Sequence, residues 1–227
     1  MRLEAILCDF GVTLDADGVA WKERFARLFA SEGSRVEAAR FDPAFYASCD
    51  ILGGAVPRDL SLAGTVGRIA SGVGERLDLD PALAARVGRR FLEASLERLA
   101  ASRALLTGLK HRFRLGVVSN FYGNLSHVLS EAGFGAVLAV SVDSAVVGAS
   151  KPDPRIFTAA LDALGLSPGD AVFVGDSQPR DMAGARGIGM PHVWLAPEPA
   201  GTVCCPGDRV IRRLADLPEA LGVEVLA

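Results

Sequence analysis

The chain has 227 residues, of which 50% are hydrophobic, and this is enough to bury one sizeable core with room for a smaller second module. The formal net charge is −3 and the sequence contains no block of basic residues, so nucleic acid is not an expected partner. No apolar run approaches the roughly 20 residues of a membrane span, and the first residues do not resemble a secretory signal, so we expect no membrane association.

The first hundred residues predict one strand followed by helices. A short apolar run at residues 5–10, which includes Asp9 and is followed by Gly11, indicates a buried strand that leads into a turn. Apolar residues three and four positions apart then predict helices at residues 21–29, 60–69 and 83–99. Asp42-Pro43 and Asp80-Pro81 each match an N-cap residue followed by a first-turn proline, so both pairs are predicted helix starts.

After residue 100, apolar runs alternate with helical patterns. The predicted strands are residues 115–119, 137–142, 171–174 and 192–195. The predicted helices are residues 125–132, 154–164, 179–186 and 216–221. Alternation of this kind is typical of right-handed βαβ units and a parallel sheet. We therefore expect an α/β fold with a Rossmann-like parallel sheet, formed by residues 1–15 and 91–227, and a helical cap at residues 16–90 inserted after the first strand.

Polar side chains suited to phosphate or metal binding follow four of the predicted strands. They are Asp9, Ser119 and Asn120, Lys151, and Asp176 and Asp181. In an open parallel sheet the carboxyl ends of the strands share one edge, where ligands bind. Residues far apart in the sequence are thus expected to converge there.

The combined side chains suit phosphoryl transfer. Asp9 and Asp176 supply the hard oxygen ligands that Mg²⁺ prefers, and without a cation two close carboxylates would raise each other's pKa. Lys151 adds a positive charge and Ser119 a hydrogen-bond donor, both suited to phosphate oxygens. Asp9 can then attack phosphorus and form an aspartyl-phosphate. We therefore expect a Mg²⁺ cofactor and a small phosphorylated metabolite as the partner.

Four stretches of the chain resemble the ordered motifs of the haloacid dehalogenase-like (HAD) hydrolases. They are Ile6-Leu-Cys-Asp9-Phe-Gly-Val-Thr13-Leu14, Val117-Val-Ser119-Asn120, Gly148-Ala-Ser-Lys151-Pro-Asp-Pro-Arg-Ile-Phe157 and Val174-Gly-Asp176-Ser-Gln-Pro-Arg-Asp181-Met-Ala-Gly-Ala-Arg-Gly-Ile-Gly-Met190. The helical insert is similar to the cap of the haloacid dehalogenase/phosphoglycolate phosphatase branch. The resemblance implies that Asp9 is the nucleophile and that phosphate is bound by Ser119, Asn120 and Lys151. It also implies that Lys151 orients the nucleophile, that Asp176 binds Mg²⁺, and that Thr13 and Asp181 support the site.

The first motif departs from the family pattern Asp-x-Asp-Gly-Thr. Gly11 stands where the second aspartate acts as general acid and base, and Val12 replaces the usual glycine. The family's Mg²⁺ takes a backbone carbonyl at this position, so the implied metal ligands remain Asp9, Gly11 and Asp176. Loss of general acid–base help costs roughly 10²–10⁴-fold in rate. A good leaving group, such as a sugar 1-phosphate or an acyl phosphate, needs less of that help, and glucose-1-phosphate phosphatase-like proteins with a similar Asp-x-Gly pattern are phosphatases.

Gly11 also leaves a second hypothesis open, in which the chain is a slow or inactive relative that binds a phosphorylated ligand. A 2-haloacid dehalogenase is a lower-ranked alternative, because such relatives carry an aromatic residue at position 11 and lack the acid pair after the fourth strand. A phosphonate-cleaving enzyme would need a cap lysine, and Lys22 shows no special surroundings. A phosphomutase normally depends on the missing aspartate.

The remaining conspicuous residues are expected to be structural. Asp15 and Asp17 are weak substitutes for the missing acid and are predicted as turn and linker residues, and Arg180 as part of a solvated helix face. Packing or surface positions are expected for a larger set: Trp21, Phe25, Phe29, His111, His127 and His192. The four cysteines, Cys8, Cys49, Cys204 and Cys205, show no metal-ligand spacing, which favours a reduced, cytoplasmic protein. The chain is expected to be a monomer or a homodimer.

Overall fold

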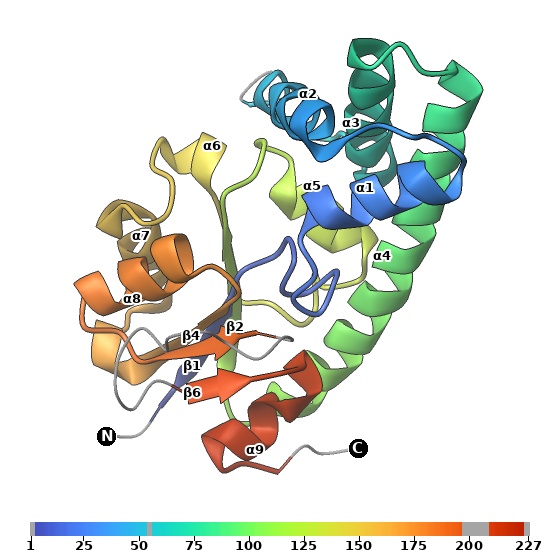
Figure 1. The fold of residues 1–227 in the computed structure, drawn as a ribbon. Helices are drawn as coiled ribbons and strands as arrows, with labels where there is room; N and C mark the ends of the chain where they lie inside the picture. Colours follow the sequence, from blue (N-terminus) through green and yellow to red (C-terminus); the bar gives the residue numbers. More distant parts are fainter. Residues whose placement is uncertain (1–2, 54–55, 197–208, 225–227) are drawn as a thin grey trace.

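The computed structural model describes residues 3–53, 56–196 and 209–224. Within these residues a six-stranded parallel sheet has the strand order β3-β2-β1-β4-β5-β6 (Figure 1). The strands are β1 (Ala5–Cys8), β2 (Arg114–Ser119), β3 (Val140–Asp143), β4 (Ala171–Gly175), β5 (His192–Leu195) and β6 (Arg209–Ile211). This confirms the predicted Rossmann-like α/β class and places β1 between β2 and β4.

Helices fall into two groups. The insert after β1 contains α1 (Trp21–Ser31), α2 (Ala38–Asp50), α3 (Leu62–Arg76) and the start of α4 (Pro81–Leu109). Figure 1 shows α1, α2 and α3 gathered to one side of the sheet, with α4 running from them down along it. The remaining helices are α5 (Leu125–Glu131), α6 (Ser144–Val147), α7 (Pro154–Leu164), α8 (Ala183–Gly187) and α9 (Leu217–Leu221), with the short turns η1 (Pro168–Asp170), η2 (Gln178–Met182) and η3 (Leu214–Asp216).

Alternate residues of β1 face opposite sides of the sheet, as the pleat requires. Ile6 and Cys8 belong to a buried cluster that includes Leu106 of α4, while Leu7 belongs to a second cluster that includes Phe157 of α7. Both faces are therefore covered, which explains why the strands read as continuous apolar runs. Cys8 is fully buried in the strand, and burial raises the pKa of its thiol to about 12.

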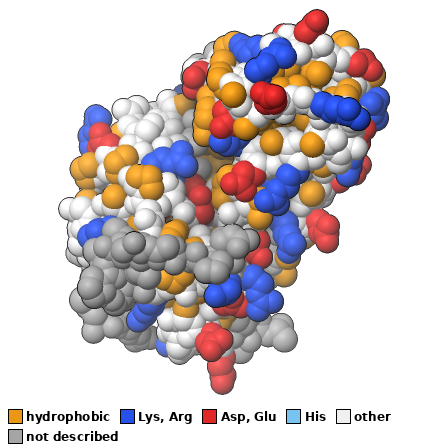
Figure 2. All heavy atoms as spheres, viewed as in Figure 1, with side chains coloured by type: hydrophobic (Ala, Val, Ile, Leu, Met, Phe, Trp, Pro, Cys, Tyr) orange, Lys and Arg blue, Asp and Glu red, His pale blue; other side chains and the backbone are white. Residues whose placement is uncertain are grey.

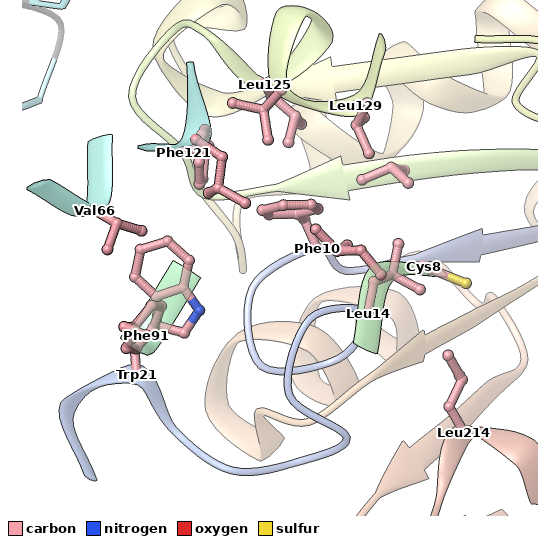
Figure 3. Packing of buried hydrophobic residues seen from close by; sticks show 14 of the residues in the cluster. Cys8, Phe10, Leu14, Trp21, Val66, Phe91, Phe121, Leu125, Leu129 and Leu214 are labelled. Carbon is pink, nitrogen blue, oxygen red and sulfur yellow. The ribbon is translucent and has the colours of Figure 1, made fainter. Parts of the chain in front are cut away.

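The helical insert and the sheet share one hydrophobic cluster. Phe10, just after β1, meets Phe121 edge to face with ring centroids 5.3 Å apart (Figure 3). Trp21 of α1 lies against Phe121 and against Phe91 of α4, with ring centroids 6.4 and 5.1 Å apart. Such pairs contribute beyond their buried area. The aromatic chain thus fixes the start of α1 next to the carboxyl end of the sheet.

The predicted helix start at Asp42-Pro43 is wrong. Helix α2 begins earlier, at Ala38, and Pro43 lies inside it. Phe41 is buried and stacks near Phe45 with centroids 6.3 Å apart, so the apolar face of the helix extends ahead of the proline. Burial of this face offsets the hydrogen bond that Pro43 does not donate. Asp42 instead forms an ion pair with Lys22.

Other predicted elements are close to the structure. The Asp80 side chain accepts a hydrogen bond from the Ala82 amide at 2.8 Å and caps α4, as predicted. Strand β3 begins three residues later than predicted, while β6 and α6 had no sequence signal that we recognised. Helix α4 is continuous across residue 90, and the division of the chain into cap and core there stays a prediction. Cys204 and Cys205 lie outside the described residues.

The surface carries charges of both signs. Figure 2 shows acidic and basic side chains intermixed on the face in view. Among the described helices, none has both the length and the hydrophobicity needed to span a bilayer.

Candidate active site

The loop after β1 carries Asp9 at the carboxyl edge of the sheet. The Asp9 amide donates to the Val174 carbonyl at 2.9 Å, which ties the loop to the end of β4. Val12 has a φ of 75°, a conformation that glycine adopts freely and a β-branched residue does not. The Val12 amide donates to Asp15 Oδ1 at 2.7 Å and so helps to hold this strained turn. The family's usual glycine at this position has a physical reason that the sequence alone did not reveal.

Lys151 lies between two carboxylates. Its Nζ is 2.6 Å from Asp9 Oδ1 and 2.7 Å from Asp181 Oδ1, and all three side chains are largely buried. Burial alone would lower the pKa of Lys151, but the charges of Asp9 and Asp181 outweigh it and raise that pKa. Lys151 therefore stays charged and fixes the orientation of Asp9.

Asp176 follows β4 and adds a third carboxylate. Carboxylate oxygens of Asp9, Asp176 and Asp181 all lie within 4.8 Å of one another, and Thr13 Oγ1 donates to Asp176 Oδ1 at 3.1 Å. Burial, followed by the negative charges of Asp9 and Asp181, raises the pKa of Asp176 to about 8. The three carboxyl groups cannot all ionise beside one ammonium without mutual repulsion, and a divalent cation would balance their negative charge.

Asn120 positions the loop that carries Lys151. Its Oδ1 accepts from the Lys151 amide at 2.7 Å and its Nδ2 donates to the Lys151 carbonyl at 3.2 Å. This reciprocal pair joins the end of β2 to the Lys151 loop. Ser119, the last residue of β2, is 3% exposed and lines the same cavity as Asn120. Direct contact of either residue with phosphate stays a prediction.

Asp143 at the end of β3 supports this edge and was not singled out from the sequence. Its Oδ2 accepts from the amides of Gly123 and Leu125 at 2.8 and 3.1 Å, and its Oδ1 accepts from the Ala145 amide. Its place directly after a predicted apolar strand could have marked Asp143 as a residue of this edge.

The site opens into a cavity of about 290 Å³ between the sheet edge and the helical insert. The lining residues are Asp9, Gly11, Val12, Ala20, Trp21, Lys22, Phe45, Tyr46, Cys49, Ser119, Asn120, Phe121, Tyr122, Lys151, Arg180 and Asp181. Sequence reasoning missed the contributions of α2 and of the two residues after Asn120. Arg180, expected on a solvated helix face, is exposed but also lines the cavity.

Most of the aromatic residues and histidines that we expected to be structural do not line the cavity. Phe25 and Phe29 are buried in the cluster of the insert and do not line the cavity, whereas Trp21 does both. His111 Nδ1 lies 2.7 Å from the Gly108 carbonyl and His127 lies 3.5 Å from Glu131. Both contacts are local to the helix that carries the histidine or to its end, and neither histidine lines the cavity.

Asp15 is a buried structural hub. One or the other of its oxygens accepts from the Val12 amide, from Trp21 Nε1 at 2.7 Å and from Arg24 at 3.1 Å, and Ser95 Oγ lies 3.3 Å away. Burial raises the pKa of Asp15 and lowers that of Arg24, a desolvation cost that these hydrogen bonds offset. Neither Asp15 nor Asp17 lines the cavity, and Asp17 Oδ1 accepts from the Leu214 amide.

Asp15→Asn is expected to lower the free energy of unfolding by about 2 kcal/mol, because it leaves the Arg24 charge without its partner and weakens hydrogen bonds to a charged acceptor. Urea unfolding of the purified protein measures this. The matched control is Asp42→Asn, which removes the more exposed ion pair with Lys22 and is expected to cost at most about 0.5 kcal/mol. Equal costs for the two variants would contradict the role of Asp15.

Comparison with known proteins gives one family. The family model described as haloacid dehalogenase-like hydrolase matches residues 11–189. The haloacid dehalogenase-like hydrolase domain-containing protein 3 of Bos taurus is 39% identical over 103 residues, which are 44% of this chain and 41% of the relative. The phosphoglycolate phosphatase of Caulobacter vibrioides is 33% identical over 159 residues, 63% of this chain and 64% of the relative. The chain thus spans less than two thirds of the length of these relatives.

Solved structures share the fold over nearly the whole chain. A HAD phosphatase from Thermococcus onnurineus superposes with a TM-score of 0.60 at 24% identity, covering 99% of this chain and 100% of its own. A structure described as a dehalogenase has a TM-score of 0.66 at 20% identity and covers 98% of both chains. At such identities the likeness concerns the fold and does not separate the two activities.

Proposed function

Because the chain belongs to the haloacid dehalogenase-like hydrolase family, we propose that it is a Mg²⁺-dependent phosphatase that removes phosphate from a small phosphorylated metabolite. The observation that supports this most is the arrangement of Lys151 between Asp9 and Asp181, with the Asp176 carboxylate close by. This set offers a nucleophile, a fixed positive charge and a place for a cation at one end of a cavity. Phosphatases among the matched relatives agree with this activity.

Each side chain has a distinct part in the proposed reaction. Asp9 attacks phosphorus in line and forms an aspartyl-phosphate, which water then hydrolyses. Lys151 holds the Asp9 carboxylate in place and neutralises charge on the phosphate oxygens, and Ser119 donates a hydrogen bond to them. Asp181 keeps Lys151 in position. The insert covers the cavity and excludes bulk water during transfer.

The residues present fit a Mg²⁺ ion. Asp9 and Asp176 are hard oxygen ligands, the Gly11 backbone carbonyl is a third candidate, and Thr13 orients Asp176. When bound, Mg²⁺ would polarise the phosphoryl group and balance the charge of the carboxylates. Burial and the neighbouring charges of Asp9 and Asp181 raise the pKa of Asp176, and a cation bound beside it would favour its ionised form.

Phosphate release tests the proposal. Purified protein is incubated with sugar phosphates, nucleotides, phenyl phosphate and acetyl phosphate, with Mg²⁺ or with EDTA, and we expect Mg²⁺-dependent release from at least one compound. Beryllium fluoride, which mimics the aspartyl-phosphate, is expected to inhibit it. Absence of phosphate release from the whole panel would contradict the proposal. Chloride release from 2-chloropropionate without metal would instead favour a dehalogenase that uses Asp9 on carbon.

Binding of Mg²⁺ is expected to release close to one proton at pH 7. A carboxyl group with a pKa of about 8 is mostly protonated at that pH, and Mg²⁺ must displace its proton. Affinity for Mg²⁺ should therefore increase as pH rises towards 8 and level off above it. Calorimetry at pH 7 in two buffers of different ionisation enthalpy measures the proton. Asp176→Asn is the control and should abolish the release, while buffer-independent heats with the native chain would refute this prediction.

A further inference from the structure

Aromatic side chains make up a large part of the cavity wall. Trp21, Phe45, Tyr46, Phe121 and Tyr122 line it, which makes five aromatic residues among sixteen lining residues. Aromatic residues are only 7% of the chain, and both of its tyrosines are in this wall. Aromatic rings favour offset or edge-to-face contacts with another ring. The wall is therefore enriched in the side chains that bind planar apolar groups.

The aromatic lining reaches the position next to Asp9 where related enzymes carry the general acid, because Gly11 lies beside the Trp21 ring. A Cβ at Gly11 would meet Trp21 Nε1 at 3.7 Å and Trp21 Cε2 at 3.9 Å. The direction in which the family's acid would project thus faces an indole ring. Trp21 Nε1 is already engaged by Asp15 at 2.7 Å, so the ring is held in place. Where related enzymes carry a proton donor, this chain presents the edge of an aromatic ring.

Few polar groups on the insert side could bind a hydroxylated or doubly charged substrate. The lining residues from the insert are Ala20, Trp21, Lys22, Phe45, Tyr46 and Cys49. Lys22 is 2.6 Å from Asp42, which neutralises its charge, and Cys49 and Tyr122 hydrogen-bond to each other. Of the described residues that line the cavity, the only acidic ones are Asp9 and Asp181, and both contact Lys151.

We propose that the substrate is a small aryl phosphate, the phosphate ester of a single-ring phenol. This rests on the proposed phosphatase function and names its substrate class. The cavity of about 290 Å³ is at the small end for ligand sites, which fits one ring beside the phosphate. The aromatic wall binds the ring, while Lys151 and Ser119 bind the phosphate.

The chemistry of the leaving group agrees with the missing acid. Asp9 Oδ forms a bond to phosphorus as the bond from phosphorus to the aryl oxygen breaks, and the electron pair leaves on that oxygen as an aryloxide. A phenol has a pKa of about 10, as in tyrosine, so its anion departs without a proton from the protein and takes one from solvent later. Water then attacks the aspartyl-phosphate, which releases phosphate and restores the Asp9 carboxylate, and the water proton passes to solvent or to the phosphate.

Three substrates separate ring binding from leaving-group quality. Acetyl phosphate has the best leaving group and no ring, phenyl phosphate has a ring and a moderate leaving group, and benzyl phosphate has a ring and a poor one. We expect kcat/KM for phenyl phosphate to exceed that for acetyl phosphate by at least about tenfold and that for benzyl phosphate by at least about 100-fold. 1-Naphthyl phosphate, which has two rings, should be poorer than phenyl phosphate.

Binding provides a readout that does not depend on turnover. With Mg²⁺ present, calorimetry should show phenylphosphonate binding at least about tenfold more tightly than methylphosphonate. Tyr46→Ser should reduce that ratio about threefold or more, because Tyr46 lines the cavity and is exposed enough to be replaced without loss of folding. Leu96→Ser is the matched control, since Leu96 is an exposed apolar residue of α4 outside the lining, and it should not change the ratio.

Two results would overturn the aryl assignment in different ways. Equal phosphonate affinities, together with turnover of acetyl phosphate or of a sugar phosphate above that of phenyl phosphate, would refute the aromatic substrate and leave the phosphatase proposal intact. Absence of turnover with every phosphate, and of binding with both phosphonates, would refute both proposals.

Discussion

Asp9→Asn is expected to reduce kcat by on the order of 10⁴-fold or more with every phosphate ester. The variant removes the nucleophile, and side chains that act as one unit give losses of that order when a central member is lost. Asparagine keeps the shape of the side chain, and Lys151 retains Asp181 as its partner at 2.7 Å. The loss should therefore appear in kcat, measured by phosphate release under saturating substrate, and not through unfolding.

Asp17→Asn is the matched control for this experiment. Asp17 lies in the same loop, accepts a hydrogen bond from the Leu214 amide and does not line the cavity. Its φ of 52° is one that asparagine tolerates well. Turnover of Asp17→Asn should stay within about twofold of the native chain, and both variants should keep the native melting temperature within a few degrees. Retained turnover in Asp9→Asn would show that the nucleophile is another group.

The sequence predicted the site residues that directly follow strands. Asp9, Ser119 and Asp176 each follow an apolar run, and parallel strands bring such ends to one edge whatever the details of packing. The contacts of Lys151 with Asp9 and Asp181 follow from the same topology. To predict that these residues lie close together, it was enough to know the order of strands and helices along the chain. The structure brings them together.

The insert side of the cavity could not be predicted in the same way. Tyr46 and Cys49 lie on α2, and their contact with the site depends on how that helix packs against α1 and α3. The spacing of apolar residues predicts which face of a helix is buried, but not which neighbouring helix packs against that face. The start of α2 was misplaced for a related reason, because burial of Phe41 outweighed the signal of Asp42-Pro43. Asp15 was similarly undervalued, since its partners Trp21, Arg24 and Ser95 come together only after folding.

The family's general acid and base is missing at position 11, and a substitution there tests how much catalysis this loss costs. A side chain there has room, because the nearest atoms to an added Cβ are those of Trp21 at 3.7 and 3.9 Å, an ordinary contact distance. Gly11 and Asp9 line the same cavity, so the added carboxyl group would lie at its wall next to Trp21. Gly11→Asp is therefore a substitution that the fold accommodates and that changes one chemical function.

Gly11→Asp is expected to raise kcat for an alkyl ester such as benzyl phosphate by on the order of 10²-fold, with KM little changed. An alkoxide is a poor leaving group and gains most from a proton donor, whereas acetyl phosphate should gain less than about threefold. Gly11→Asn is the matched control, because it has the same size and cannot deliver a proton, and it should give no gain. A loss of turnover with both esters would show that the site depends on glycine. Turnover that appears only in Gly11→Asp, with ligand affinity unchanged from an inactive native chain, would mean that the native role is to bind a phosphorylated ligand.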